Sequence, residues 1–249
     1  MAIIEIENLS HVFADGTMGL GDISIAIEAG TFVVIAGPNG SGKTTLLRHL
    51  NGLIPAQKGR VCVSGFQVGK NLKLARQVVG MVFQDANSQI VGETVYDDVA
   101  FGPENLCLER TLVKQKVRQA LTAVGLSGVE DKRPHLLSGG EKRRLAIAGV
   151  LAMDPKVLVL DEPFSNLDYP GALQILKQII ALHRNGHTII ITTHELEKVI
   201  AHADRLIILS EGVVARDGKP ADVVADVERF GVRKPCCVRM GMGIESWLN

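Results

Sequence analysis

Eight consecutive residues in the amino-terminal part of the chain have the types and spacing of a phosphate-binding loop. They read Gly37-Pro-Asn-Gly-Ser-Gly-Lys-Thr44 and match the pattern G-x-x-x-x-G-K-[ST]. Glycines let such a loop turn its backbone N–H groups inward, and a helix that begins at the loop adds a partial positive charge. Lys43 would then lie between the β and γ phosphates of a nucleotide, and the Thr44 hydroxyl would bind Mg²⁺. The predicted nucleotide-binding residues are Gly37, Pro38, Asn39, Gly40, Ser41, Gly42, Lys43, Thr44 and Thr45.

Two adjacent acids follow a second apolar run, VLVLDEP, at residues 157–163. A buried strand in this position would place Asp161 and Glu162 at its carboxyl end, where ligands of open α/β sheets bind. Asp161 is then a candidate to hold Mg²⁺, and Glu162 is a candidate to polarise the attacking water. Two acids before a proline turn are common in proteins, but this pair follows a nucleotide-binding loop. Hydrolysis of the bound nucleotide is therefore the favoured interpretation.

The strand-like segments predict how these residues are positioned. Short β-type runs alternate with helical stretches, which is typical of an α/β domain with a mostly parallel sheet. Residues 2–9 and 22–28 alternate apolar and polar side chains and predict a small antiparallel layer at the N-terminus. The remaining predicted strands cover residues 31–37, 60–65, 78–84, 156–163 and 187–194, with a hairpin at 205–218.

The middle of the chain has a helical pattern. Residues from about 93 to 153 contain no clear strand run, so they predict a helical subdomain inserted between strands of the core, with a break at Pro103. We expect one nucleotide-binding domain over residues 1–227. Residues 228–249 lack a clear period and are expected to form a tail.

Composition excludes several classes of protein. The chain has 249 residues, with 27 Lys and Arg residues balancing 27 Asp and Glu residues. Zero net charge disfavours nonspecific nucleic-acid binding, and the aromatic content of 4% disfavours a surface that stacks single-stranded bases. No apolar run approaches the roughly 20 residues that span a bilayer. We therefore expect that the chain does not itself cross a membrane. The four cysteines form no CxxC pair, so we expect free thiols.

The segment Leu137-Ser-Gly-Gly-Glu-Lys-Arg-Arg144 lies between the two predicted catalytic segments, and with it the chain resembles the ATP-binding cassette (ABC) ATPases. This resemblance implies a P-loop NTPase fold that binds ATP with Mg²⁺. It also implies that Ser138, Gly139 and Gly140 contact the ATP held by another subunit in a head-to-tail dimer. Ser138 and Glu141 have the spacing of a helix capping box as well, and the two roles are compatible.

Four further residues match motifs of that family in the same order. Gln84, in VFQD, corresponds to a residue that senses the γ-phosphate and Mg²⁺, and Asp168 ends a loop that crosses the dimer interface. His194 matches the histidine that holds the γ-phosphate and the attacking water. Phe13 has the position of an aromatic residue that stacks on adenine, although the family more often has tyrosine there and a core phenylalanine is the alternative.

Residues 83–105 resemble a narrower group, the ATPase components of energy-coupling factor (ECF) transporters. In that group a second glutamine, here Gln89, follows the first, and the region lines a groove for short helices of a transmembrane T component that carry an arginine. Asp97 and Asp98 are candidate partners of such an arginine, since a carboxylate accepts a guanidinium bidentately. Two solvated acids in the first turn of a helix are the alternative.

The ECF resemblance implies a peripheral ATPase subunit at the cytoplasmic face of the membrane. Its partners would be the T component, a substrate-binding component and a second ATPase subunit, either identical or different. The cargo would be cobalt, nickel, biotin or another vitamin, and it would be recognised elsewhere. His183 and His187 are separated by an Asn-Gly turn and are not expected to bind metal, while adjacent Cys236 and Cys237 are expected to be unpaired thiols.

Two other functions are compatible with a cassette ATPase. A soluble ATPase could act on nucleic acid or the ribosome, but such proteins usually have two cassettes, a coiled coil or zinc modules, and the net charge here is zero. A nucleotide-binding regulator without turnover would not need Glu162 and His194.

Overall fold

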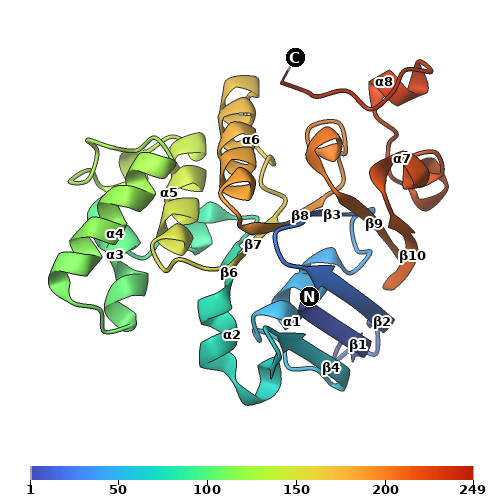
Figure 1. Ribbon diagram of the computed structural model, residues 1–249, viewed down its shortest axis with the longest axis horizontal. Helices are drawn as coiled ribbons and strands as arrows, with labels where there is room; N and C mark the ends of the chain where they lie inside the picture. Colours follow the sequence, from blue (N-terminus) through green and yellow to red (C-terminus); the bar gives the residue numbers. More distant parts are fainter. Residues whose placement is uncertain (1, 249) are drawn as a thin grey trace.

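Two β-sheets form the framework of the protein in the computed structural model, which describes residues 2–248 (Figure 1). The smaller sheet is antiparallel and has the order β2-β1-β4-β5. Its alternating pattern buries Ile23, Ile25 and Ile27 on one face, as period-two patterning requires. The strands of this sheet are β1 (Ala2–Val12), β2 (Met18–Glu28), β4 (Lys58–Val63) and β5 (Phe66–Gln67).

The larger sheet has the order β10-β9-β3-β8-β7-β6, and every pair in it is parallel except β9 with β10. Its central strands β3, β7 and β8 are buried along their whole length, which explains their nearly continuous apolar sequence. This sheet confirms the predicted α/β fold. Its strands are β3 (Phe32–Ala36), β6 (Val79–Val82), β7 (Val157–Asp161), β8 (Thr188–Thr193), β9 (Arg205–Ser210) and β10 (Val213–Gly218).

Helices cover both faces of the larger sheet, because the side chains of its strands alternate between two hydrophobic cores. In β3, Val34 packs in one core, and Val33 and Ile35 pack in the other, which includes residues of α1 and the smaller sheet. The helices are α1 (Lys43–Leu50), α2 (Leu72–Val78), α3 (Val95–Asn105), α4 (Arg110–Ala123), α5 (Gly139–Leu151), α6 (Tyr169–Arg184), α7 (Pro220–Val223) and α8 (Cys236–Arg239). The sequence patterns used above did not identify α2 and α6.

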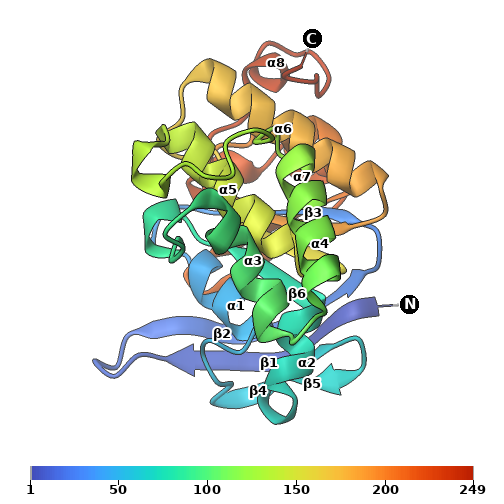
Figure 2. The same ribbon diagram turned by 90° about the vertical axis from the view of Figure 1, so that its left-hand side faces the viewer.

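Helices α3, α4 and α5 lie together at one end of the molecule, as Figure 2 shows from that side. Val99, Val117 and Leu145, one from each helix, are fully or almost fully buried. The expected break at Pro103 is wrong in position. Pro103 lies inside α3, the helix continues to Asn105, and the N–H of Leu106 still donates to the carbonyl of Gly102. Pro103 has no N–H to donate to the carbonyl of Val99, and α3 ends two residues later.

The C-terminal segment lies against the main domain, with α8 at the upper right of Figure 1. The backbones of Glu195 and Arg233 form an isolated β-bridge, and the side chains of Tyr169 and Trp247 make an edge contact with 5.0 Å between ring centroids. Val238, Ile244 and Leu248 also pack against the large core. Isolated contacts of this kind have no period in the sequence. Residue 249, the end of the predicted tail, lies outside the described residues.

The structure of residues 2–248 bears on the expectations about membrane spans, cysteines and histidines. No helix in this range combines the length and the apolar character needed to cross a bilayer. The four cysteines are free thiols, and no group of three or more His, Cys, Asp or Glu side chains in this range is arranged to hold a metal ion. His183 and His187 bind different backbone carbonyls, those of Gly30 and Pro155. The two histidines therefore do not form a shared site.

Candidate nucleotide site

The loop between β3 and α1 has a backbone that only glycine accommodates well. Gly40 and Gly42 have φ angles of 81° and 99°, in the region that L side chains rarely adopt. A Cβ on Gly37 would lie 2.2 Å from the carbonyl oxygen of Leu209. Ser41 is buried, and its hydroxyl has no hydrogen-bond partner within the described part of the chain. The loop leads directly into the N-terminus of α1, where a phosphate would bind.

Lys43 is the first residue of α1 and its side chain is buried within the site. Its Nζ donates hydrogen bonds to the carbonyl oxygens of Gly37, at 2.7 Å, and Pro38, at 3.0 Å. The carboxylate of Glu162 lies 3.8 Å away. Burial lowers the pKa of Lys43 below its usual value, and the negative charges of Glu162 and Asp161 partly oppose that effect. The ammonium group is held at the loop that would receive the phosphates.

Asp161 and Thr44 meet at the carboxyl end of β7. The Thr44 hydroxyl donates to Oδ2 of Asp161 at 2.8 Å, and the Thr192 hydroxyl donates to Oδ1 at 2.5 Å. The parallel register of β7 and β8 pairs Asp161 with Thr192. A carboxylate and a hydroxyl within hydrogen-bond distance form an oxygen donor set of the kind that Mg²⁺ prefers, so these residues fit the predicted metal site.

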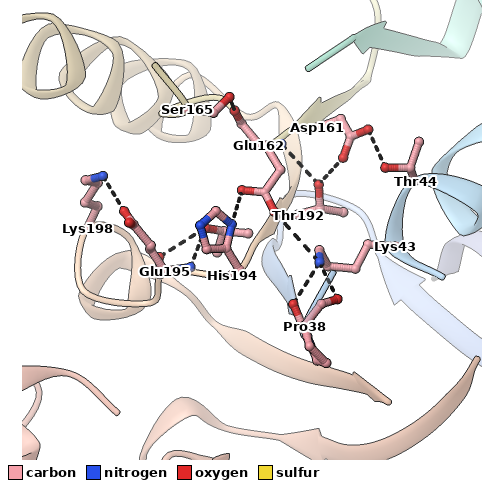
Figure 3. A network of polar contacts seen from close by, with 12 residues as sticks. Pro38, Lys43, Thr44, Asp161, Glu162, Ser165, Thr192, His194, Glu195 and Lys198 are labelled. Carbon is pink, nitrogen blue, oxygen red and sulfur yellow. Dashed lines mark hydrogen bonds and ion pairs between the residues drawn. The ribbon is translucent and has the colours of Figure 1, made fainter. Parts of the chain in front are cut away.

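Glu162 is held in a strained conformation beside Asp161. Its φ angle is 47°, which is rare for a residue with a long side chain. Its N–H donates to the carbonyl oxygen of Thr192 at 3.1 Å and lies 3.2 Å from the hydroxyl of the same residue. Its Oε2 lies 2.9 Å from Nδ1 of His194, so the carboxylate stands between His194 and Lys43 (Figure 3). The surrounding hydrogen bonds aim this carboxylate toward the loop.

Lys43, Thr44, Glu162 and His194 line one cavity of about 550 Å³, and Asp161 lines an adjoining cavity that shares Thr44 and Gln84 with it. Phe13 lies at the first cavity with 41% of its surface exposed, so it is not a core residue. A Cβ on Gly42 would lie 2.6 Å from the carbonyl oxygen of Gly19, and a Cβ on Gly19 would lie 2.7 Å from the Phe13 ring. This close packing of glycines brings β2 and the Phe13 ring up to the loop. The residues that line the first cavity are Phe13, Thr17, Met18, Gly19, Asn39, Gly40, Gly42, Lys43, Thr44, Thr45, Gln84, Glu162 and His194.

Gln84 lines the same cavity. The sequence predicted that Gln84 ends a strand, but it does not. Strand β6 ends at Val82, and the side chain of Gln89 binds the backbone on both sides of that residue. The Phe83 N–H donates to Oε1 of Gln89 at 3.0 Å, and Nε2 of Gln89 donates to the carbonyl of Met81 at 3.1 Å. Gln84 therefore lies on a loop beyond the sheet edge.

Ser138, Gly139, Gly140 and Asp168 lie together in a different cavity, of about 360 Å³, which shares no lining residue with the first. The capping box is present: the Glu141 N–H donates to Oγ of Ser138 at 3.3 Å, and the Ser138 N–H donates to the Glu141 carboxylate at 2.8 Å. Asp168 caps α6 in a similar way. One chain therefore separates the two predicted halves of the ATP site.

Two residues that organise the site were not predicted from the sequence. Thr192 joins the backbone of Glu162 to the side chain of Asp161, and Arg143 links two loops to α5. The signal for Thr192 is a polar residue within an otherwise apolar strand, TIIITT. The signal for Arg143 is a charge in a helix that is buried on more than one face.

A phosphate-binding loop between a central parallel strand and a helix, with Asp161 and Glu162 at the end of a nearby strand, defines the class of P-loop nucleotide hydrolases. The family model described as ABC transporter matches residues 20–165. The chain belongs to the ABC transporter family. Two relatives, 45% and 43% identical to it, are energy-coupling factor transporter ATP-binding proteins.

Relatives of known sequence support this membership. The energy-coupling factor transporter ATP-binding protein EcfA of Methanocaldococcus jannaschii is 45% identical, over 92% of this chain and 83% of the relative. A putative ABC transporter ATP-binding protein of Halobacterium salinarum is 46% identical, over 94% of this chain and all of the relative.

Solved structures show the same fold. CbiO1 from Clostridium perfringens, part of the ABC transporter complex CbiONQ, is 38% identical, has a TM-score of 0.83, and the match covers 92% of both chains. The bacterial ABC transporter cassette MJ0796 was solved as a dimer bound to ADP and phosphate; it is 26% identical with a TM-score of 0.78, over 87% of this chain and 98% of that one.

We expect Phe13→Ala to weaken ATP binding by about 1–3 kcal/mol, the usual contribution of one aromatic residue stacked on a base. The phosphate loop is unchanged in this variant, so affinity for inorganic triphosphate, which has no base, should stay at the wild-type value. Calorimetric titration of both ligands measures the difference. Phe13→Tyr is the control and should bind ATP like the wild type. Equal affinity of Phe13→Ala and wild type for ATP would show that the ring does not stack on adenine.

Proposed function

We propose that this ABC ATPase hydrolyses Mg²⁺-ATP in a head-to-tail dimer and thereby moves the membrane components of an ECF importer. The observation that carries the hydrolytic part is the position of the Glu162 carboxylate, 2.9 Å from His194 and 3.8 Å from Lys43, above a phosphate-type loop. A carboxylate held between a lysine and a histidine can accept a proton from water next to the γ-phosphate.

In this proposal each residue has a separate task. Lys43 and the backbone N–H groups of the loop bind the β and γ phosphates and stabilise the charge that develops on the γ-phosphoryl group. Glu162 accepts a proton from the attacking water. At the same time the water oxygen bonds to the γ-phosphorus, and the bond between that phosphorus and the ADP oxygen breaks. His194 holds Glu162 in place and donates toward the γ-phosphate. The products are ADP and inorganic phosphate.

The same site supports the binding of Mg²⁺ by Thr44, Gln84 and Asp161. Thr44 and Asp161 are already within 2.8 Å of each other, and Gln84 lines the adjoining cavity. A bound Mg²⁺ would neutralise part of the phosphate charge. The protein's contribution is to fix the two oxygens, and Thr192 does this for Asp161 through its 2.5 Å hydrogen bond.

The separation of the two cavities supports the head-to-tail dimer. Ser138 lies at the N-terminus of α5, which has 13 residues, and Gly140 leaves the space in front of it almost open. A helix N-terminus favours phosphate, yet no residue of the first cavity lines this one. A second subunit, identical or different, would bring its own bound ATP to Ser138, Gly139 and Gly140, with Asp168 close to the shared surface.

A groove on the helical subdomain supports the membrane partner. This cavity, of about 460 Å³, is mostly apolar, and Phe101 at its side is 55% exposed. Asp98 lines it, with Oδ1 accepting hydrogen bonds from the N–H groups of Val91 and Gly92. Asp97 instead closes the capping box of α3 with Thr94. Of the two acids, Asp98 is therefore the better candidate for an arginine on a short helix of the T component.

The proposed setting is the cytoplasmic face of a membrane, where the subunit would be peripheral. A T component and a substrate-binding component would complete the transporter. The cargo would be a metal cation, cobalt or nickel, or a vitamin. This cargo class rests on the resemblance of residues 83–105 to the ATPase components of ECF transporters. The 38% identity to CbiO1, which is part of the CbiONQ complex, supports assembly with other transporter subunits.

The transporter assignment predicts that Phe101→Arg loses the T component without losing ATP binding. The long cationic side chain would occupy the apolar groove and compete with the arginine of the partner helix for the Asp98 carboxylate, which lines the same groove. The measurement is co-purification of membrane components with the tagged chain from its own cells, together with the ATP affinity of the isolated chain. Met240→Arg is the matched control, since Met240 is an apolar residue, 76% exposed, outside the groove. Equal recovery of membrane components with both variants would contradict the groove as the docking site.

A further inference from the structure

A buried arginine connects the helical subdomain to the catalytic loops. Arg143 lies in α5, four residues after the Gly139 that begins the helix, and only 4% of its surface is exposed. Its Nη1 donates to the carbonyl oxygen of Phe83 at 2.7 Å. Phe83 immediately precedes Gln84. The guanidinium therefore holds the start of the Gln84 loop against α5.

The other side of the same guanidinium leads to Glu162. Nη2 of Arg143 lies 3.4 Å from Oγ of Ser165. The Ser165 hydroxyl donates to the carbonyl oxygen of Glu162 at 2.8 Å, and the Ser165 N–H donates to the same oxygen at 3.1 Å (Figure 3). These contacts connect α5 through Ser165 to the backbone of Glu162, whose φ angle is 47°. A conformation of this kind persists only where neighbours hold it.

The chemistry of Arg143 suits this task better than a role in packing. Burial lowers the pKa of Arg143, and the charges of Asp85 and Asp161 oppose that effect. Both hydrogen-bond acceptors of the guanidinium are neutral, and none of the ion pairs found in residues 2–248 includes it. An apolar residue would fill the same space without the cost of desolvating a charge. What a guanidinium adds is a rigid fork that fixes two acceptors at a set separation.

We propose that Arg143 is a positioning residue for hydrolysis, which holds the Gln84 loop and the Glu162 backbone in one arrangement relative to α5. Arg143 does not line the nucleotide cavity, so it acts through Phe83 and Ser165. A rotation of the helical subdomain would be transmitted by this contact to both catalytic residues at once. The inference rests on the proposed function, because it concerns the rate of the hydrolysis described there.

The test is a double-mutant cycle with Arg143→Gln and Ser165→Ala. Each single variant should lower kcat by about tenfold, the loss expected for one hydrogen bond of a charged group, with the KM and Kd for ATP unchanged. Because both residues act through the same contact chain, the double variant should lose no more than the larger of the two single losses. Lys142→Gln, which changes the preceding charge on the same helix, is the control and should keep wild-type kcat.

Conservative variants separate positioning from simple loss of stability. Ser165→Thr keeps a hydroxyl and should recover most of the kcat that Ser165→Ala loses, and this comparison remains informative if Arg143→Gln does not fold. Losses that multiply in the double variant, a raised KM in place of a lowered kcat, or equal kcat for Ser165→Ala and wild type would each overturn the inference. Absence of ATP hydrolysis by the wild-type protein would instead contradict the proposed function.

Discussion

Glu162→Gln is expected to lower ATP turnover by about 10²- to 10⁴-fold, the usual contribution of a positioned general base. The amide has nearly the same shape as the carboxylate, so it still fits between Lys43 and His194 but cannot accept the proton of the attacking water. ATP binding should remain, since the phosphate loop is unaltered. The variant should then accumulate as an ATP-bound dimer. Phosphate release and sedimentation of the chain with ATP measure the two effects.

The control for this variant is Glu109→Gln, which removes an exposed carboxylate at the start of α4. It should hydrolyse ATP at the wild-type rate and show no ATP-dependent dimer beyond that of the wild type. Undiminished phosphate release by Glu162→Gln would exclude Glu162 as the base. In that case His194, whose Nδ1 lies 2.9 Å from the Glu162 carboxylate, would be tested as the base.

Lys43→Ala is the second change with a large expected effect. Removal of one charge-assisted contact to phosphate should weaken ATP binding by about 1.5–3 kcal/mol, or roughly 10- to 100-fold in Kd. Stabilisation of the transition state should also be lost, because the same ammonium group faces the charge that develops on the γ-phosphoryl group. Turnover at saturating ATP should therefore fall as well. Calorimetry with ATP and phosphate-release kinetics over a range of ATP concentrations measure both losses.

Ser138→Arg provides the contrast for Lys43→Ala. Ser138 lines the separate cavity, so this variant should bind ATP with wild-type affinity. A bulky side chain there would block the approach of the partner's nucleotide, so turnover should be lost. If Lys43→Ala retained ATP affinity, the loop would not be the nucleotide site. If Ser138→Arg retained turnover, the head-to-tail dimer would be wrong.

The catalytic motifs were predictable from the sequence because each is contiguous and determines its own local conformation. Gly40 and Gly42 permit the positive φ angles that the loop needs, and the apolar run before Asp161 favours a buried strand. The Ser138 cap was predictable for the same reason, since its partner Glu141 is three residues away. The sequence left open whether Phe13 is a core residue; the structure shows it exposed, with its ring packed against Gly19 beside the loop.

By itself the sequence determined the fold class, the phosphate loop and the order of the motifs, whose information lies within a few residues. Tertiary structure decided which motifs share a cavity, because this depends on the register between distant strands. The pairing of β7 with β8 brings Thr192 to Asp161 and His194 to Glu162 across about 30 residues of chain. Tertiary structure also decided the role of Arg143, since only the packing of α5 against the sheet shows that this charge is buried between two loops.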